Sequence, residues 1–330
     1  MSGQTQEAAA FTGLIDLAAE MLGGQALDAS DEFFAPKENL LKPGRGRFEP
    51  DVYTDRGKWM DGWETRRRRS PGLDWCVIRL GLPGVIRGVD IDTNHFLGNN
   101  PSYASIDAKN GESGDWVEIL PRVPLRPGAQ NLFGVMNQTA WTHIRLNIYP
   151  DGGVARLRVY GDVAVDWRVL PDEDIDLACL RYGGKAVACS DRFFSPVENL
   201  ILPGEAHHMG EGWETRRRRG PGYDWAIIQL GRAGQLHRIE INTRHFKGNY
   251  PDLCSLDGCV APDEPVDSLT WPEFEWVNII PKTSMKPDHL HVFEGESISN
   301  AGPFTHVKLN VFPDGGVSRL RVYGQIAQGR

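Results

Sequence analysis

The chain carries the same sequence pattern twice, and this duplication constrains its fold more than any other feature. The segment GWETRRRR occurs unchanged at residues 62–69 and 212–219. Near the end of each copy, THIRLNIYPDGGVARLRVYG from Thr142 matches THVKLNVFPDGGVSRLRVYG from Thr305, with 15 of 20 positions identical. A period of roughly 155 residues is far too long for a solenoid repeat and is typical of a domain. Each copy is therefore expected to fold around its own core.

The spacing between matching segments changes along the chain, which locates the loops. The offset between the copies is 160 residues at the start, 150 in the middle and 163 at the end. Insertions are therefore expected in residues 42–61 of the first copy and 259–271 of the second, both of which contain proline. We predict a first domain over residues 1–161, a linker over 162–170, a second domain over 171–324 and a short tail over 325–330.

Each copy is predicted to consist mostly of β-strands. Runs such as DWCVIRLG, VIRGVDID and WVEILP are apolar or alternate in polarity, which is typical of strands. The PDGG segments at Pro150 and Pro313 predict a tight hairpin between the last two strands of each copy. Helical spacing is confined to the residues before Gly23-Gly24 and Gly183-Gly184, where glycine would end a short helix. The sequence thus predicts an all-β fold with two tandem antiparallel sandwiches, each preceded by a short helix.

Composition excludes several classes of protein. The 44 acidic and 36 basic side chains give a net charge of -8, which opposes nucleic-acid binding. No run approaches the roughly 18 uncharged apolar residues of a membrane-spanning helix. The five cysteines are odd in number and form no CxxC pair, so reduced, mostly buried thiols are expected in place of disulfides or a zinc site. Since the N-terminus has no basic n-region or Arg-rich transit character, we expect a cytoplasmic protein with no nucleic-acid and no membrane partner.

The four consecutive arginines of each copy are the first candidate site. In an extended segment alternate side chains share a face, so Glu64, Arg66 and Arg68 would lie together. The corresponding residues of the second copy are Glu214, Arg216 and Arg218. Arginine binds carboxylates and phosphates through two parallel hydrogen bonds, and a neighbouring glutamate can position it or transfer protons. The alternative is a solvated charged face without a ligand.

The motif HFxGNxP is the second candidate site. It places His95 and Asn99 in the first copy, and His245 and Asn249 in the second, just after a predicted strand. Histidine exchanges protons near neutral pH, and asparagine offers both a donor and an acceptor to an amide-like ligand. The alternative is a structural turn in which the histidine binds backbone groups.

Motifs of the common enzyme classes are missing, and the two copies differ in detail. The chain has no GxSxG, Walker A, GxGxxG or HExxH motif, which removes the commonest nucleophilic, nucleotide-binding and zinc-protease interpretations. Between the copies, Asp92 is replaced by Asn242, Asn94 by Arg244 and Asn100 by Tyr250. Unequal sites are therefore expected, and the second copy is favoured to hold the anion through the additional Arg244.

Taken together, the duplicated GWETRRRR, DWxxIxLG, DTxHFxGN and PDGGVxRLRVYG segments strongly resemble the allantoicase (allantoate amidinohydrolase) family over nearly the whole chain. The resemblance implies two jelly-roll sandwiches of the galactose-binding-like type. It also implies a hydrolase of linear amidines and ureides that converts allantoate to (S)-ureidoglycolate and urea in purine (allantoin) degradation. It brings no agreed assignment of catalytic residues, so the roles are taken from chemistry.

Loss of urea from allantoate breaks an aminal C–N bond, which needs proton transfer and no acyl nucleophile. Proton transfer is assigned to four residues: Glu64, His95, Glu214 and His245. Substrate binding is assigned to seven residues: Arg66, Arg68, Asn99, Arg216, Arg218, Arg244 and Asn249. No cofactor is predicted, and the sequence leaves open whether a divalent metal ion polarises the ureido oxygen.

The same sequence features also fit two other functions. A tandem carbohydrate- or small-anion-binding protein without catalysis would use the same sandwich, because fold does not determine function. A related ureide enzyme acting on ureidoglycolate is a third interpretation. The expected partners are the small-molecule substrate and further copies of the chain, since two sandwiches leave broad sheet faces and edges to cover in a homo-oligomer.

Overall fold

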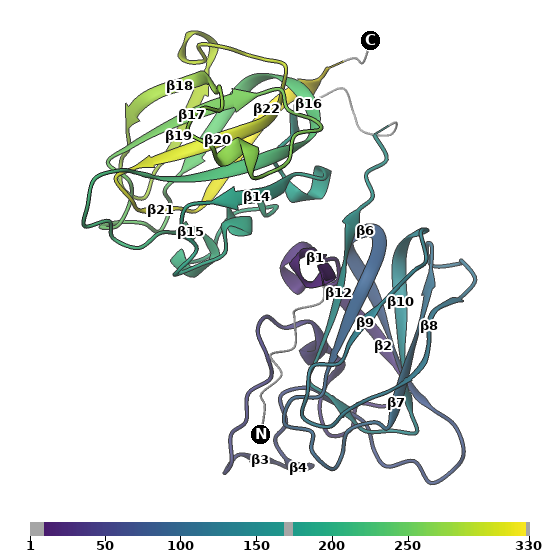
Figure 1. Ribbon diagram of the computed structural model, residues 1–330. Coiled ribbons are helices and arrows are strands. Elements are labelled where there is room, and N and C mark those ends of the chain that lie inside the picture. Colours follow the sequence, from purple (N-terminus) through teal and green to yellow (C-terminus); the bar gives the residue numbers. More distant parts are fainter. Residues whose placement is uncertain (1–9, 168–173, 328–330) are drawn as a thin grey trace, which may run out of the picture. The chain divides into compact units, whose positions relative to one another are not determined.

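A computed structural model describes residues 10–167 and 174–327 and divides the chain into two compact units, Met1–Ala164 and Val165–Arg330. Each unit contains one of the two sequence repeats (Figure 1). Residues 168–170 of the predicted linker and 328–330 of the predicted tail lie outside the described residues.

The first unit consists of strands and short 3-10 helices, labelled η. Its elements are η1 (Ala10–Gly13), β1 (Ile15–Asp16), η2 (Glu20–Leu22), β2 (Gln25–Ala29), η3 (Lys37–Leu41), β3 (Tyr53–Thr54), β4 (Gly57–Lys58), β5 (Trp63–Glu64), β6 (Asp74–Asp92), β7 (Tyr103–Lys109), β8 (Val117–Pro124), β9 (Leu132–Gly134), β10 (Ala140–Tyr149), β11 (Gly153–Val154) and β12 (Arg156–Val163).

The long strand β6 belongs to both layers of the first sandwich. Its first part pairs with β2 and β10, and β10 continues through β7 to β8. Its second part pairs with β12 and β9, and β12 continues to β1. All of these pairs are antiparallel. The two predicted strands DWCVIRLG and VIRGVDID are thus one strand of 19 residues that connects the layers.

The core lies between the layers, as the alternation of apolar residues predicts. Cys76 and Ile78 of the first part of β6, and Val89 and Ile91 of the second part, are fully buried. Burial of such side chains contributes roughly 1.5–3 kcal/mol each to folding. The prediction of an all-β chain with two tandem sandwiches is confirmed.

The second unit repeats this architecture around β16. Its elements are β13 (Ile175–Asp176), η4 (Leu180–Tyr182), β14 (Lys185–Cys189), η5 (Val197–Ile201), η6 (Met209–Glu211), β15 (Trp213–Glu214), β16 (Asp224–Asn242), β17 (Leu253–Cys259), η7 (Ser268–Thr270), β18 (Val277–Ser284), β19 (Leu290–Glu294), η8 (Gly295–Ser297), β20 (Phe304–Phe312), β21 (Gly316–Val317) and β22 (Arg319–Ile326).

The helix before each sandwich is shorter than the helical spacing suggests. It is a single 3-10 turn, η2 or η4, and it ends at a left-handed glycine, Gly23 with φ 93° and Gly183 with φ 81°. In the first unit a turn and the strand β1 precede η2, because this segment bonds to the edge of β12. The predicted glycine stop is therefore present, but the preceding residues do not form one continuous helix.

The predicted PDGG hairpin is wrong. The strand β10 pairs with β6 and β7, whereas β12 pairs with β6 and β1, so the two predicted hairpin partners lie in different layers. The connecting residues instead form β11, which pairs with β5 through Gly153 opposite Glu64 and Val154 opposite Trp63. The connection crosses from one layer to the other, and its backbone forms hydrogen bonds with the GWETRRRR segment.

The five cysteines are free thiols, and all except the half-buried Cys189 are buried. Burial raises the pKa of Cys179 to about 11 and that of Cys259 to about 12, so both remain protonated and unreactive at neutral pH. Within residues 10–167 and 174–327, no helix has the length and apolar character that a membrane span requires.

Candidate functional site

The first unit has a cavity of about 900 Å³ at the GWETRRRR segment. Such a volume lies within the range of about 300–1,000 Å³ that small-molecule sites occupy. Four segments that are separate in sequence line it. They contribute Phe33 and Phe34; Glu64 to Arg69; Gly98, Asn99, Asn100 and Ser102; and Pro150 to Gly152.

Glu64 lies in the cavity wall because β5 is held from two sides. Its backbone pairs with Gly153 of β11 and also forms an isolated bridge with Ala35. The preceding Trp63 is fully buried and donates from Nε1 to the carbonyl of Asp31 at 2.8 Å. These contacts fix the strand that presents the Glu64 carboxyl group to the cavity.

Asn99 is the side-chain partner of Glu64. Its Nδ2 donates to Oε1 of Glu64 at 2.7 Å, and its backbone carbonyl accepts a bond from the N–H of Gly153 at 2.8 Å. A side chain at Gly153 would collide with the buried ring of Phe96, so glycine is required there. The HFLGN loop, the PDGG segment and β5 therefore assemble one site from three motifs.

Glu64 is only 9% exposed. Burial raises the pKa of its carboxyl group, and the hydrogen bond from Asn99 opposes this rise. A carboxyl group with a raised pKa is protonated at higher pH than an ordinary glutamate, which suits it to donate a proton.

The four arginines of the first unit fall into two classes. Arg66 and Arg68 are held by carboxylates: Arg66 Nε lies 2.7 Å from Asp31, and Arg68 Nη1 lies 2.6 Å from Asp74. Arg67 and Arg69 are exposed and line the cavity, and neither has a hydrogen-bond or ion-pair partner within the described residues. The structure thus leaves these two guanidinium groups available to an anionic ligand.

Three aspartates that sequence analysis did not single out organise this segment. Asp31 accepts bonds from the backbone and side chain of Arg66, and Asp151 of the PDGG segment accepts the backbone N–H of Arg68 at 2.8 Å. Asp74 is buried and binds the side chain of Arg68. Each aspartate recurs at the matching position of the second copy, which was the available sequence signal.

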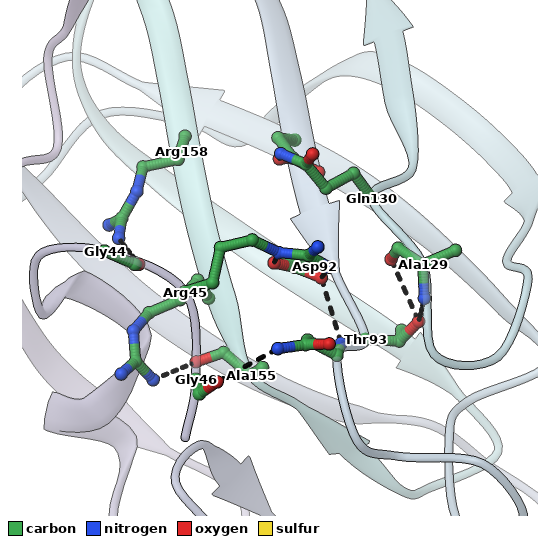
Figure 2. Close-up of polar contacts among 12 residues, drawn as sticks. Gly44, Arg45, Gly46, Asp92, Thr93, Ala129, Gln130, Ala155 and Arg158 are labelled. Atoms are coloured by element: carbon green, nitrogen blue, oxygen red, sulfur yellow. Dashed lines mark hydrogen bonds and ion pairs between the residues drawn. The ribbon is translucent and has the colours of Figure 1, made fainter. Parts of the chain in front are cut away.

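Ionic and backbone contacts hold the insertion at residues 42–61 to β6, to the loop that follows β6 and to β12 (Figure 2). Arg45 donates through two nitrogens to the buried carboxylate of Asp92, at 2.7 and 2.8 Å. Arg158 of β12 donates to the carbonyl of Gly44 at 2.7 Å, and Asn94 donates to the carbonyl of Gly46 at 2.9 Å. Asp92 and Asn94, which differ between the copies, therefore hold the insertion in the first unit.

The far end of the same insertion supports the cavity wall. Arg56, in the β3–β4 hairpin, donates from Nη1 to the carbonyl of Phe33 at 3.1 Å and lies over the Phe33 ring at 5.3 Å. Phe33 and Phe34 stack edge to face and line the cavity. The second unit has no equivalent hairpin within its described residues, and Phe193 and Phe194 are much more exposed there, at 65% and 60%.

The structure does not join His95 to Glu64, although both residues were assigned to proton transfer. Its backbone is left-handed, with φ 68°, and its ring stacks on Phe48 of the insertion with centroids 5.5 Å apart. No hydrogen bond joins His95 to Glu64 in the part of the chain that the structure describes, and His95 does not line the cavity. The turn around His95 is therefore structural, although the His95 ring contacts Phe48 and not the backbone groups that the alternative interpretation expected.

The second unit reproduces the central contacts. Asn249 Nδ2 donates to Glu214 Oε1 at 2.6 Å, and Arg216 Nε lies 2.7 Å from Asp191. Arg218 forms an ion pair with the buried Asp224. The binding geometry that the repeat predicts is therefore present twice.

Arg244 and His245 contact the loop that precedes η6. Arg244 forms an ion pair with Glu205, and His245 Nε2 lies 2.8 Å from the carbonyl of Ala206. Neither residue lines the cavities at the arginines of the second unit, which are formed by Ser190, Asp191 and Arg216 with their neighbours. Asp92 and Asn94 bind the long insertion of the first unit, whereas Arg244 binds the shorter loop before η6 in the second unit. The sequence differences at these positions therefore accompany loops of different length.

Other histidines have structural contacts. The rings of His143 and His306 lie 2.8 and 3.0 Å from the hydroxyl groups of Thr142 and Thr305, and burial lowers the pKa of both histidines. Among the described residues, no group of three or more His, Cys, Asp and Glu side chains is arranged to hold a metal ion.

Comparison with known proteins identifies the family. The family description "Allantoicase repeat" matches residues 15–164 and 175–327. "Probable allantoicase 1" of Burkholderia mallei is 48% identical over 94% of both chains, and "Probable allantoicase" of Rhizobium meliloti is 47% identical over 96% of both. The crystal structure of allantoicase from Saccharomyces cerevisiae is 40% identical, with a TM-score of 0.78 over 94% of this chain and 92% of that chain. The chain therefore belongs to the allantoicase family.

Proposed function

We propose that this protein hydrolyses allantoate to ureidoglycolate and urea in the cavity of the first unit. Family membership supports the substrate, because the similar proteins are named allantoicases. The cavity supports the location, since a buried carboxyl group and two unpaired guanidinium groups line it together. The observation that carries the proposal is the Glu64–Asn99 pair beside Arg67 and Arg69.

The carboxylate of allantoate binds Arg67 and Arg69 in this proposal. Both arginines lack partners among the described residues, whereas Arg66 and Arg68 are already engaged by Asp31 and Asp74. The ion pairs of Arg66 and Arg68 hold the segment in place. A guanidinium–carboxylate contact is strong and directional, so it fixes the reacting carbon near Glu64.

Glu64 acts first as a general acid. Its protonated carboxyl group gives a proton to the departing ureido nitrogen, and the C–N bond breaks with its electron pair going to that nitrogen. The lone pair of the second ureido nitrogen stabilises the resulting acyliminium carbon, much as a ring oxygen stabilises an oxocarbenium ion in glycoside hydrolysis.

Glu64 then acts as a general base. Water adds to the acyliminium carbon, and its proton passes to the Glu64 carboxylate, which restores the starting acid. The products are one urea and one ureidoglycolate. Asn99 uses one amide hydrogen to hold Glu64, and its second hydrogen has no partner among the described residues, so it is available to a ureido oxygen.

The proposal also includes a cytoplasmic homo-oligomer. The free thiols support a reducing compartment, where cysteines remain unpaired. The edge strands β1 and β8 each pair with one neighbouring strand, which supports association between copies.

Product analysis tests the proposed reaction. Purified protein should release one urea for each allantoate consumed under initial-rate conditions, with ureidoglycolate as the second product. A diureido analogue without the carboxylate should react far more slowly. Binding of allantoate without urea release would overturn the hydrolase proposal, and equal rates on both compounds would overturn the arginine clamp.

A further inference from the structure

We propose that Met209 caps the second copy of the site, so that Glu214 and Asn249 form a latent allantoate site that is closed in this protein. This inference rests on the proposed function of the first unit and concerns why the second unit does not share it. It explains how two nearly identical sets of residues can give one working site per chain.

The residues that define the site are equivalent in the two units. The Glu–Asn hydrogen bond measures 2.7 Å in the first unit and 2.6 Å in the second. The backbone carbonyl of Asn249 accepts the N–H of Gly316 at 2.8 Å, as the carbonyl of Asn99 accepts that of Gly153. A difference in function therefore has to come from what surrounds these residues.

Met209 contacts the asparagine of the second unit. The Nδ2 atom of Asn249 donates to Glu214 and also to the Met209 Sδ atom, at 3.2 Å. Both amide hydrogens of Asn249 thus have partners. In the first unit, Glu64 is the acceptor of the Asn99 Nδ2 atom within the described residues, no second acceptor contacts that atom there, and Asn99 lines the cavity.

The cavities differ accordingly. The first unit has about 900 Å³ of space bordered by Glu64, Asn99 and the arginines. The second unit has separate cavities of about 260 and 300 Å³ at its arginines, and neither is lined by Glu214 or Asn249. Met209 is 42% exposed, so it lies at the surface of the unit and not in its core, and it contacts Asn249 from there.

The segment that carries Met209 is held in place. Glu211 accepts the backbone N–H of His207 at 2.7 Å, and the carbonyl of Glu211 accepts a bond from the buried Arg319 at 2.7 Å. This segment occupies the chain position of the longer insertion that builds the wall in the first unit. The shorter loop therefore places a methionine where the longer one leaves space.

Binding stoichiometry tests the inference. In a Glu64→Gln, Glu214→Gln background, which slows turnover in both units, isothermal titration calorimetry with allantoate should give one site per chain. Adding Met209→Ala should give two sites, because the contact with Asn249 is lost and the space opens. The matched control, Met209→Leu, keeps the volume and should remain at one site. Adding Asn249→Leu to the Met209→Ala variant should abolish the second site.

Two sites before any change at Met209, or one site after Met209→Ala in a folded protein, would overturn the inference. A crystal structure of Met209→Ala gives a test independent of ligand: a single cavity lined by Glu214, Asn249 and the arginines is expected. A cavity that remains divided would overturn the inference as well. Urea release by the unmodified protein is measured separately, so failure of the proposed function is distinguished from failure of the capping role.

Discussion

Asn99 and Glu64 are 35 residues apart in sequence, yet the Asn99 amide donates a 2.7 Å hydrogen bond to the Glu64 carboxyl group. This bond favours the charged form of Glu64, whereas burial favours the protonated form. The balance between them sets the pH range in which Glu64 can act as an acid.

Asn99→Leu should shift the pH dependence of kcat upward. Burial already raises the pKa of Glu64, and losing the Asn99 bond raises it further. Because the reaction needs the protonated carboxyl group first, activity falls as pH rises through this pKa, so the falling limb should move to higher pH in the variant. A pH–rate profile measures the shift, and Asn249→Leu is the matched control that should leave the profile unchanged. A limb that moves to lower pH would contradict the assignment of Glu64 as the acid.

Arg67→Ala should lower kcat/KM for allantoate by about 10- to 150-fold, since a hydrogen bond to a charged group is worth about 1.5–3 kcal/mol. The loss should be much smaller with the uncharged diureido analogue, because that compound has no carboxylate for Arg67 to bind. Arg217→Ala removes the matching arginine of the second unit and should have little effect. Equal losses on both compounds would show that Arg67 does not recognise the carboxylate.

Asp74→Asn should destabilise the first unit by about 1–3 kcal/mol, because it leaves the charge of Arg68 without its buried partner. It should also raise KM, since Arg68 supports the segment that binds the substrate. Asp224→Asn should cost similar stability in the second unit but leave kcat/KM unchanged. Thermal melts and steady-state kinetics distinguish these outcomes, and the account fails if Asp224→Asn impairs catalysis as strongly as Asp74→Asn.

Arg56→Ala should raise KM several-fold with little change in kcat, because it frees the Phe33 wall from the β3–β4 hairpin. Lys58→Ala is the matched control on the same hairpin, since Lys58 lies over Phe48 and not over the cavity wall. Steady-state kinetics on allantoate measure both variants. Equal KM values for Arg56→Ala and the unmodified protein would remove Arg56 from the support of the wall.

The sequence predicts the architecture well because the duplication and the strand periodicity are local signals. Alternation in DWCVIRLG reports which side chains of β6 face the core, and the structure buries Cys76 and Ile78 accordingly. The hairpin predicted from the PDGG segment is wrong because turn residues report only on their immediate neighbours. The strand that pairs with this segment, β5, is almost 90 residues earlier in the chain. The turn residues alone do not specify a strand partner that is so distant in sequence.

The site was predicted in part for the same reason. Glu64 and Asn99 were both singled out, and the structure joins them. The sequence also assigned His95 to proton transfer. Its contact with Phe48 depends on the insertion at residues 42–61, whose path the sequence does not specify. Which arginines are free also depends on Asp31 and Asp74, whose distances to the arginines only the folded chain defines.

The most direct test of the central claim compares kcat for Glu64→Gln, Glu214→Gln and the double variant, with folding checked by thermal melts. Removing a proton-transfer group costs roughly 10²- to 10⁴-fold in rate. We predict a loss of this size for Glu64→Gln, activity within about twofold of the unmodified protein for Glu214→Gln, and a double variant no worse than Glu64→Gln alone. Two half-active single variants with an inactive double variant would contradict a single working site in the first unit, and a fully active double variant would remove both glutamates from the reaction.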